Sequence, residues 1–310
     1  MKTLVISTSS FDIDNNPPLQ HLLKNGLKII TNPHRRKLTE DEIIALLKDG
    51  AIGLIAGIEP LTERVFQSAG HLKVISRCGT GLDSVDLAAA KNHGVTVLNT
   101  PEAPAQAVAE LTMGLMLALL RQINPIHQAV CNGEWPRTQG RLLAAQTVGI
   151  IGLGHIGRRV ARLCQAFEAT VIAHDPYVNQ VPTDVTLVPL ESLLATADII
   201  RLHLPYSADT HHLLSAKALT AMKPEAIVIN AARGGLVDED ALLAALKSGK
   251  ISAAALDAFE QEPYHGQLIE CGNAILTSHI GSLARESRQR MEIEAAENLL
   301  QGLIKTGLIK

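Results

Sequence analysis

Aromatic side chains are scarce in this chain of 310 residues and make up 3% of it. An excess of positive charge is missing too, because 28 Lys and Arg residues stand against 31 Asp and Glu residues, for a formal net charge of −3. Nucleic-acid-binding proteins need a basic face to neutralise phosphates, and single-strand binders also need aromatic side chains on which bases stack. The composition therefore argues against a nucleic-acid partner.

Cysteine and long apolar runs are also rare. The longest apolar stretch, 111–120, is about half of a membrane span, and the apolar run after Lys2 is too short for a signal peptide. The cysteines include no C-x-x-C pair and suit reduced thiols better than a disulfide framework. We therefore predict a cytoplasmic protein without a membrane partner. The four cysteines are Cys78, Cys131, Cys164 and Cys271.

The chain does contain a regular alternation of β-branched runs and amphipathic segments. This alternation is typical of βαβ units and parallel sheets, and the length fits about two domains at roughly 150 residues each. In the first half, helices are expected near 85–92, at Thr62, and at Thr39, where Thr39 and Glu42 form a capping box. The expected strands there are Thr3–Ser7, Lys28–Thr31, Gly53–Ala56, Lys73–Ser76 and Val95–Leu98.

The segment 101–121 differs, because apolar residues cover nearly all of its faces. It predicts a helix buried on all sides, between domains or against a second subunit. Residues 122–145 have weak periodicity and are interpreted as an extended arm or connector. A second α/β unit begins at Thr147, and a long helix from Leu283 is expected to pack back on the first unit. The expected strands of the second unit are Val148–Ile151, Thr170–His174, Ile199–His203, Ala226–Asn230, Ala253–Leu256 and Ala274–Thr277, and its helices are Ile156–Phe167, Leu190–Ala195, Ala216–Met222 and Glu239–Leu246.

These elements predict an α/β protein with two doubly wound parallel-sheet domains. The first domain is discontinuous and comprises residues 1–99 and 283–310. The second comprises residues 100–282 and includes the apolar helix and the arm, 101–145. Hinges are expected near 99–100 and 282–283, where domain closure would exclude water from a site in the cleft.

A glycine fingerprint, Gly152-Leu153-Gly154-His155-Ile156-Gly157, follows an expected strand and opens an expected helix. Its glycines allow a tight turn, close approach of a pyrophosphate and close helix–strand packing, and the helix N-terminus attracts phosphates. Asp175 ends the next strand, 18 residues after Gly157. A carboxylate there can bind the ribose hydroxyls of NAD and repel the 2′-phosphate of NADP. The sequence predicts NAD as the cofactor and leaves use of NADP open.

Polar residues follow three later strands, at the carboxyl ends where an open α/β sheet binds its ligands. They are N-A-A-R-G-G-L-V-D at 230–238, D-A-F-E-Q-E-P at 257–263 and S-H-I-G-S at 278–282. With these segments the chain resembles the D-isomer-specific 2-hydroxyacid dehydrogenases, and within them the D-3-phosphoglycerate dehydrogenases, over about residues 73–289. The resemblance implies a flavodoxin-like substrate domain, a Rossmann NAD domain and a cleft between them.

The resemblance implies that Arg233, Glu262 and His279 carry the chemistry. His279 can exchange a proton near neutral pH, so it would protonate a keto oxygen in reduction and accept the hydroxyl proton in oxidation. Glu262, if it contacts the imidazole, would orient the ring and favour its charged form. Arg233 would hold the substrate carboxylate with its planar fork. Glu260 is the main rival to Glu262, which is preferred because the family's acid precedes a proline.

Further cofactor contacts follow from the same matching. Asp257 lies where the family's acid meets the nicotinamide amide, and the loop 203–205 is expected to flank the adenine. Ala231 would present its backbone to the nicotinamide side, and His155 would contribute its N–H rather than its ring. No metal is expected, because the pair 211–212 has no carboxylate or Cys at ligand spacing and is interpreted as a solvated loop. The expected cofactor residues are Gly152, Gly154, His155, Ile156, Gly157, Asp175, His203, Leu204, Pro205, Ala231, Asp257 and Gly281.

Substrate binding is expected in the loop Arg77-Cys78-Gly79-Thr80-Gly81, whose glycine-rich backbone can direct N–H groups at an anion. Phosphoglycerate dehydrogenases often show R-x-G-x-G-x-D here, with the arginine near the phosphate. Arg77 is therefore a phosphate candidate, and a surface salt bridge is the alternative. The run G-E-W-P-R at 133–137 resembles an arm that relatives can extend into the neighbouring subunit. Arg137 is a second phosphate candidate, donated by the partner in a homodimer.

The leading hypothesis is an NAD-dependent dehydrogenase of 3-phospho-D-glycerate, which would belong to serine biosynthesis. Many such enzymes carry a C-terminal serine-sensing domain, and this chain is expected to be a short form without it. A glyoxylate/hydroxypyruvate reductase, or a D-lactate-type enzyme, has nearly the same motifs and stays open. A non-catalytic NAD(H)-binding regulator also stays open, although the joint presence of Arg233, Glu262 and His279 argues against it.

Overall fold

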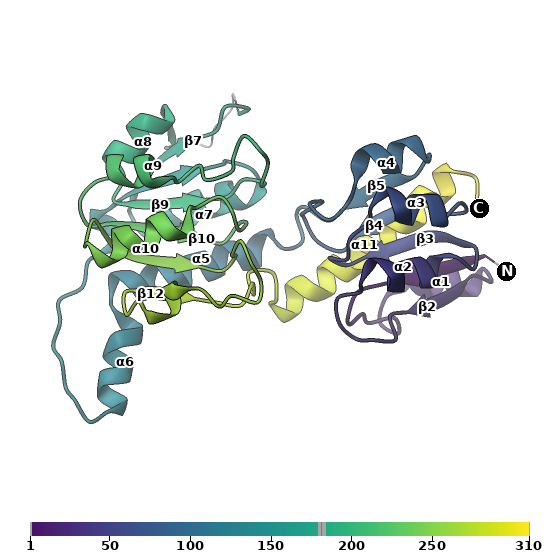
Figure 1. Ribbon diagram of the computed structural model, residues 1–310, viewed down its shortest axis with the longest axis horizontal. Helices are drawn as coiled ribbons and strands as arrows, with labels where there is room; N and C mark the ends of the chain where they lie inside the picture. The colour runs from purple at the N-terminus through teal and green to yellow at the C-terminus, as the bar shows by residue number, and fades with distance from the viewer. Residues whose placement is uncertain (1, 179–180, 182–183, 310) are drawn as a thin grey trace. The chain divides into compact units, whose positions relative to one another are not determined.

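The computed structural model describes residues 2–178, 181 and 184–309 of the chain. The chain divides into two compact units, of which unit 1 comprises Met1–Pro104 with Ala284–Lys310 and unit 2 comprises Ala105–Leu283 (Figure 1). Each unit has a parallel sheet with helices on both faces, as predicted for the fold class. No helix among the described residues combines the length and apolar character needed to span a membrane.

Unit 1 is built on a parallel sheet in the order β2-β1-β3-β4-β5. The order reverses between β1 and β3, so the carboxyl ends of these strands form the switch point at which such sheets bind ligands. The strands are β1 (Thr3–Ile6), β2 (Lys28–Thr31), β3 (Ala51–Ala56), β4 (Val74–Arg77) and β5 (Thr96–Asn99), and the helices are α1 (Pro17–Lys24), α2 (Glu40–Leu47), α3 (Glu63–Ser68), α4 (Leu87–Asn92) and α11 (Arg285–Lys305).

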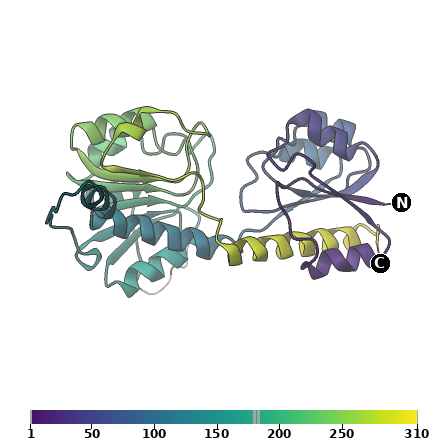
Figure 2. The same cartoon turned by 90° about the horizontal axis from the view of Figure 1, so that it is seen from below.

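The helices of unit 1 show why this sequence folds this way locally. Thr39 and Glu42 make the expected capping box at the start of α2, which satisfies backbone N–H groups that have no partner within the helix. The C-terminal helix α11 packs on β3 and β4, as expected. A Cβ on Gly53 would lie 2.8 Å from Leu299, so the helix approaches the sheet closely at this glycine. Figure 2 shows α11 and α1 side by side on one face of the sheet.

Unit 2 is built on a parallel sheet in the order β12-β11-β10-β9-β6-β7-β8, which reverses between β6 and β9. Helices α5 and α7 pack on one face of the sheet, and α8, α9 and α10 on the other. The strands are β6 (Thr147–Ile151), β7 (Thr170–His174), β8 (Thr186–Leu187), β9 (Ile199–Leu202), β10 (Ala226–Asn230), β11 (Ile251–Leu256) and β12 (Ala274–Leu276). The helices are α5 (Ala105–Leu120), α6 (Ile123–Cys131), α7 (His155–Ala166), α8 (Leu190–Thr196), α9 (Ala216–Ala221) and α10 (Glu239–Lys247), with short 3-10 turns at Leu143–Ala145 and Gln267–Glu270.

The prediction for 122–145 was wrong in part. Helix α6 occupies the start of this segment. Pro125 is compatible with the helix because it lies in the first turn, where a proline removes no helical hydrogen bond. None of the described residues of α6 is buried, and residues 132–140 continue as an exposed segment. The arm is therefore a solvent-exposed helix followed by extended chain.

Within the single chain, the apolar helix α5 is not buried on all sides, and its burial against a second subunit stays a prediction. Gln106, Glu110 and Gly114 form an exposed stripe at a spacing of one helical turn. The opposite side packs on α7 and the sheet of unit 2. The few polar residues and the glycine within this apolar run thus identify the side of the helix that faces solvent.

Candidate active site

The glycine fingerprint lies at the switch point of unit 2, because Gly152 follows β6 and His203 follows β9. A Cβ on Gly152 would lie 2.3 Å from the carbonyl oxygen of His203, and one on Gly157 would lie 2.1 Å from the carbonyl oxygen of Gly152. Only glycine permits such close approach of these backbone segments. A Cβ on Gly154 would meet none of the described atoms within 4 Å, so a ligand can reach the backbone there.

This cradle fits the pyrophosphate of a dinucleotide. Helix α7 begins directly after Gly154, so its first N–H groups and its positive dipole end face the open side of the turn. Asp175 follows β7, where its Oδ2 accepts from the N–H of Leu153 at 2.8 Å and its Oδ1 from the N–H of Tyr177 at 2.9 Å. The carboxylate is therefore fixed against the fingerprint, and its contact with a ribose stays a prediction.

The other predicted cofactor residues also lie on the loops after the strands of unit 2. Ala231 and Gly281 are buried, whereas His203, Leu204 and Ile156 are half-buried, and His155 and Pro205 are exposed. His203 has a partner that the sequence analysis did not foresee, since its Nε2 contacts the guanidinium of Arg201.

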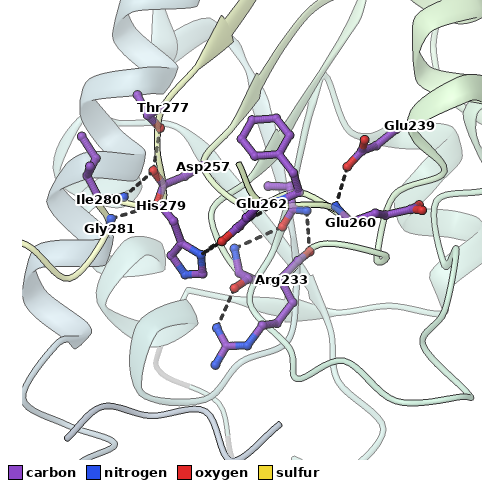
Figure 3. A network of polar contacts seen from close by, with 12 residues as sticks. Arg233, Glu239, Asp257, Glu260, Glu262, Thr277, His279, Ile280 and Gly281 are labelled. Atoms are coloured by element: carbon purple, nitrogen blue, oxygen red, sulfur yellow. Dashed lines mark hydrogen bonds and ion pairs between the residues drawn. The ribbon is translucent and has the colours of Figure 1, made fainter. Parts of the chain in front are cut away.

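His279 and Glu262 are in direct contact (Figure 3). Nδ1 of His279 lies 3.0 Å from both carboxylate oxygens of Glu262. The N–H of Phe259 donates to Oε1 of Glu262 at 3.1 Å, which fixes the carboxylate. The two side chains are 45% and 41% exposed, so a ligand can reach them. Glu262 occupies Nδ1, and none of the hydrogen bonds found among the described residues uses Nε2.

Asp257 anchors the loop that carries His279. This carboxylate is 1% exposed and accepts from Oγ1 of Thr277 at 2.6 Å and from the N–H groups of Ile280 and Gly281 at 2.8 Å each. His279 has a φ of 56°, a left-handed conformation that is strained for a residue with a side chain. The bonds to Asp257 on either side hold the loop in that conformation. They already use both carboxylate oxygens, so contact of Asp257 with a nicotinamide stays a prediction.

Arg233 lies in a turn held by Asn230, a residue whose importance the sequence analysis missed. Asn230 ends β10, is 1% exposed, donates from Nδ2 to the carbonyl oxygen of Arg233 at 2.7 Å and accepts the N–H of Ala232 at 3.1 Å. Nη1 of Arg233 donates to the carbonyl oxygen of Ala232 at 2.7 Å. In Figure 3 the guanidinium of Arg233 and the imidazole of His279 point to the same side of the network. The sequence did contain a signal for this role, because Asn230 is a polar amide at the end of an otherwise apolar strand.

Glu260, the rival to Glu262, is engaged elsewhere. Its N–H donates to Oε1 of Glu239 at 2.8 Å, and its own Oε1 lies 2.7 Å from Nε2 of His212. The interpretation of 211–212 as a solvated loop therefore needs correction, because His212 also lies 3.9 Å from Asp238. Among the described residues, no group of three or more His, Cys, Asp and Glu side chains could hold a metal ion.

Unit 1 presents the predicted substrate loop after β4. The N–H of Cys78 donates to Ala56, and that of Gly79 to the carbonyl oxygen of Arg77 and to Oγ1 of Thr100, so these two groups do not face an anion. The Cys78 thiol is buried, whereas Thr80 is exposed and Gly81 half-buried. The half-buried Arg77 contacts the carbonyl oxygen of Cys78. Fewer backbone N–H groups of this loop are therefore available to bind an anion than the sequence predicted.

A buried acid at the switch point of unit 1 was not foreseen. Glu59 is 1% exposed and accepts from Oγ of Ser7, directly after β1, and from the N–H of Gly57, directly after β3. Burial raises the pKa of this carboxyl, and the nearby Arg77 opposes that effect weakly. Arg137, the second phosphate candidate, lies in the exposed segment of unit 2 that follows α6.

Comparison with known proteins supports a dinucleotide-binding site in unit 2. Residues 113–281 match the family described as D-isomer specific 2-hydroxyacid dehydrogenase, NAD binding domain. A hydroxypyruvate reductase of Thermotoga maritima is 36% identical over 93% of this chain and 97% of its own length. A D-3-phosphoglycerate dehydrogenase of Methanocaldococcus jannaschii is 40% identical over 84% of this chain, which covers 51% of that relative. The TT0316 protein of Thermus thermophilus superposes with a TM-score of 0.89 at 36% identity, over 98% of this chain and 97% of that one.

The chain is thus an NAD-dependent oxidoreductase of the two-sheet α/β class. It belongs to the D-isomer-specific 2-hydroxyacid dehydrogenases. It spans about half the length of the D-3-phosphoglycerate dehydrogenases that it matches and nearly the full length of the hydroxypyruvate reductase. Relatives of both names match at similar identity, so the substrate has to be argued from the site.

Proposed function

We propose that the chain interconverts 3-phospho-D-glycerate and 3-phosphohydroxypyruvate. The bound cofactor supplies or accepts the hydride at C2. The observation that supports the reaction type is the contact of His279 Nδ1 with both oxygens of Glu262. A histidine held by a carboxylate through one nitrogen presents the other to a hydroxyl or keto oxygen, which is the proton exchange that this reaction needs.

In this proposal each residue of the site has a separate task. Glu262 keeps a proton on Nδ1, so Nε2 of His279 donates to the keto oxygen in reduction and accepts from the hydroxyl in oxidation. Arg233 binds the substrate carboxylate through its planar fork, which sets the C2 oxygen beside His279. Asp257 and Asn230 act through other residues, because they hold the loops that carry His279 and Arg233.

Arg77 is the proposed phosphate contact in unit 1. It ends β4, next to the switch point, where an open α/β sheet binds its ligands. Relatives named D-3-phosphoglycerate dehydrogenase match most of this chain at 35–40% identity, which supports a phosphorylated substrate. Arg137 of the partner subunit is the second proposed contact, and the resulting enzyme would take part in serine biosynthesis.

An unphosphorylated substrate such as hydroxypyruvate is the second candidate. Glu59 favours it, because this buried carboxyl interacts with the charge of Arg77, and its ionised form would compete with a phosphate dianion for that charge. A relative named hydroxypyruvate reductase also matches nearly end to end. The two candidates differ in the role of Arg77 and share the roles of His279, Glu262 and Arg233.

Initial rates of NAD reduction with 3-phospho-D-glycerate and with D-glycerate, at equal concentrations, separate the candidates. The wild type is expected to prefer the phosphorylated acid, and Arg77→Ala should abolish that preference. Arg64→Ala is the matched control, since Arg64 is an exposed arginine of unit 1 that pairs with Glu40 and Asp41. A wild-type preference for D-glycerate would move the assignment to the second candidate. NADH binding without turnover of any 2-keto acid would indicate a non-catalytic regulator.

A homodimer is part of the proposal. Helix α6 has no buried residue among those described, yet it carries Ile123 and Val130, which are about half exposed, and Trp135 beyond it is 81% exposed. Apolar side chains displayed in this way are typical of an interface. Sedimentation of the wild type and of Ile123→Asp should show a dimer that the charge weakens, and a monomeric wild type would refute this part.

A cytoplasmic location completes the proposal. Cys78, Cys131, Cys164 and Cys271 are all free thiols. Burial raises the pKa of the Cys78 thiol to about 11, which keeps it protonated and unreactive. Free thiols are typical of a reducing compartment.

A further inference from the structure

A charged side chain lies inside the core of unit 2. Arg201 is in the middle of β9, between Ile150 of β6 and Ile229 of β10, and is 0% exposed. Its pKa is lowered to about 10 by burial, so the guanidinium still carries its charge at neutral pH. Buried arginines are normally paired with an acid.

Arg201 has no such acid. Its Nε and Nη1 find no hydrogen-bond acceptor among the described residues, and Nη2 contacts only Nε2 of His203. Besides His203, the ionisable group that interacts with Arg201 is the thiol of Cys164 on α7, whose pKa is raised by burial. An uncompensated buried charge destabilises the folded chain, so its presence calls for a gain elsewhere.

The position of Arg201 indicates where that gain arises. Its strand neighbour Ile150 is two residues before Gly152, the first glycine of the cradle. His203, which Arg201 contacts, lies with its carbonyl oxygen against Gly152. Arg201 is therefore on the strand next to the one that leads into the glycine turn, and it contacts the residue whose backbone packs against that turn.

His203 cannot carry this charge itself. A guanidinium only donates, so Nε2 of His203 must accept, and the ring is neutral with its proton on Nδ1. Burial and the charge of Arg201 both lower the pKa of His203 well below its usual value. His203 therefore adds no positive charge to that of Arg201.

We propose that Arg201 is an electrostatic determinant of dinucleotide binding, whose buried charge is compensated when the pyrophosphate dianion occupies the cradle. The interaction acts through the low-dielectric interior rather than by direct contact. The inference rests on the NAD site and is independent of the substrate. It implies that the same side chain destabilises the free protein and stabilises the complex.

Neutral variants and truncated ligands test this directly. Arg201→Met and Arg201→Gln should weaken binding of ADP-ribose, measured by calorimetry, by about tenfold, the order of one charge–charge interaction across a protein interior. Adenosine, which lacks the pyrophosphate, should bind within about twofold of wild type because no charge is involved. Arg201→Lys should keep most of the ADP-ribose affinity. The free Met variant should melt at a higher temperature than the wild type.

Cys164→Ala is the matched control, because it alters packing in the same core cluster without changing charge. It should lower the melting temperature and leave ADP-ribose affinity unchanged. Equal losses for ADP-ribose and adenosine in the neutral variants would attribute the effect to loop shape and overturn the proposal. Unchanged ADP-ribose affinity would overturn it too, as would neutral variants that are less stable than wild type or fail to fold. Because ADP-ribose undergoes no hydride transfer, these outcomes do not depend on the proposed reaction.

Discussion

The carboxyl ends of the strands in the two sheets carry polar groups of different kinds. In unit 2, His279 and Glu262 are both more than 40% exposed and bound to each other. In unit 1, Glu59 is 1% exposed and accepts hydrogen bonds from the hydroxyl of Ser7 and the amide of Gly57. An exposed acid–base pair exchanges protons with a ligand at little cost, whereas a buried acid resists ionisation. We therefore expect changes in unit 2 to affect the chemistry and changes in unit 1 to affect the choice of substrate.

The largest effect is expected at His279. His279→Ala removes the group that exchanges a proton with the C2 oxygen, so kcat should fall by about 10²- to 10⁴-fold. The affinity for NADH, measured by fluorescence titration, should stay within a factor of about two, because the imidazole exchanges the proton and does not bind the pyrophosphate. Unchanged turnover would assign proton transfer to another residue.

Arg233→Lys should have the next largest effect. An ammonium cannot reproduce the two parallel bonds of a guanidinium to a carboxylate, so we expect kcat/KM to fall by about 10²-fold despite the retained charge. The measurement is steady-state kinetics with the keto acid and NADH. Wild-type kinetics in this variant would exclude bidentate binding and leave only a role for the charge.

A smaller effect is expected at Asp175. Asp175→Ala removes the carboxylate beside Leu153, so the ratio of kcat/KM for NADH to that for NADPH should fall by about tenfold or more. Asp198→Ala offers a control, because Asp198 is a carboxylate of unit 2 that pairs with Lys223. An unchanged cofactor ratio in Asp175→Ala would remove its role at the ribose.

Glu59→Gln tests the role of the buried acid in unit 1. The pKa of Glu59 is raised in the folded chain, so its contribution to stability is complete below about pH 4.5 and is lost as pH rises through the folded pKa. The variant should escape this loss, so its free energy of unfolding should rise relative to that of the wild type as pH increases above about 4.5, measured by urea unfolding. It should also raise the preference for phosphorylated over unphosphorylated acid.

Glu63→Gln is the control for that experiment. Glu63 is on the surface of the same unit, where hydrogen bonds from His93 and Gln67 lower its pKa. Its contribution therefore has the opposite sign, present above about pH 4.5 and lost as pH falls. A Glu59→Gln profile parallel to wild type would show that the buried carboxyl does not titrate in this range.

Local patterns predicted local structure well. The capping box at Thr39 and Glu42, the strand Thr170–His174 and the alternation of strands and helices follow from interactions within a few residues. The class of enzyme also followed from short motifs, whose glycines and polar residues have a physical reason to be where they are. The prolines in the first turns of α1 and α6 were a signal that the sequence analysis missed, because a proline there does not end a helix.

Contacts between distant segments were beyond reach. Glu59 accepts a hydrogen bond from Ser7, 52 positions away in the chain, and no local sequence pattern around either residue predicts this contact. The N–H groups of Cys78 and Gly79 have internal acceptors that only the folded sheet brings near. Arg201 carried a signal, a lone cation in an apolar strand, but its lack of an acid partner is a property of the surrounding core.

The discontinuous build of unit 1 has a consequence for how the chain is made. Residues 105–283 complete unit 2 before α11 leaves the ribosome, whereas β3 and β4 are synthesised early and are covered by α11 only at the end. Until then the sheet surface around Gly53 and Val74, which packs under Leu299 and Gly302, has no cover. The strands β3 and β4 therefore complete their packing only after unit 2 has been synthesised, and their apolar surface stays exposed in the interval.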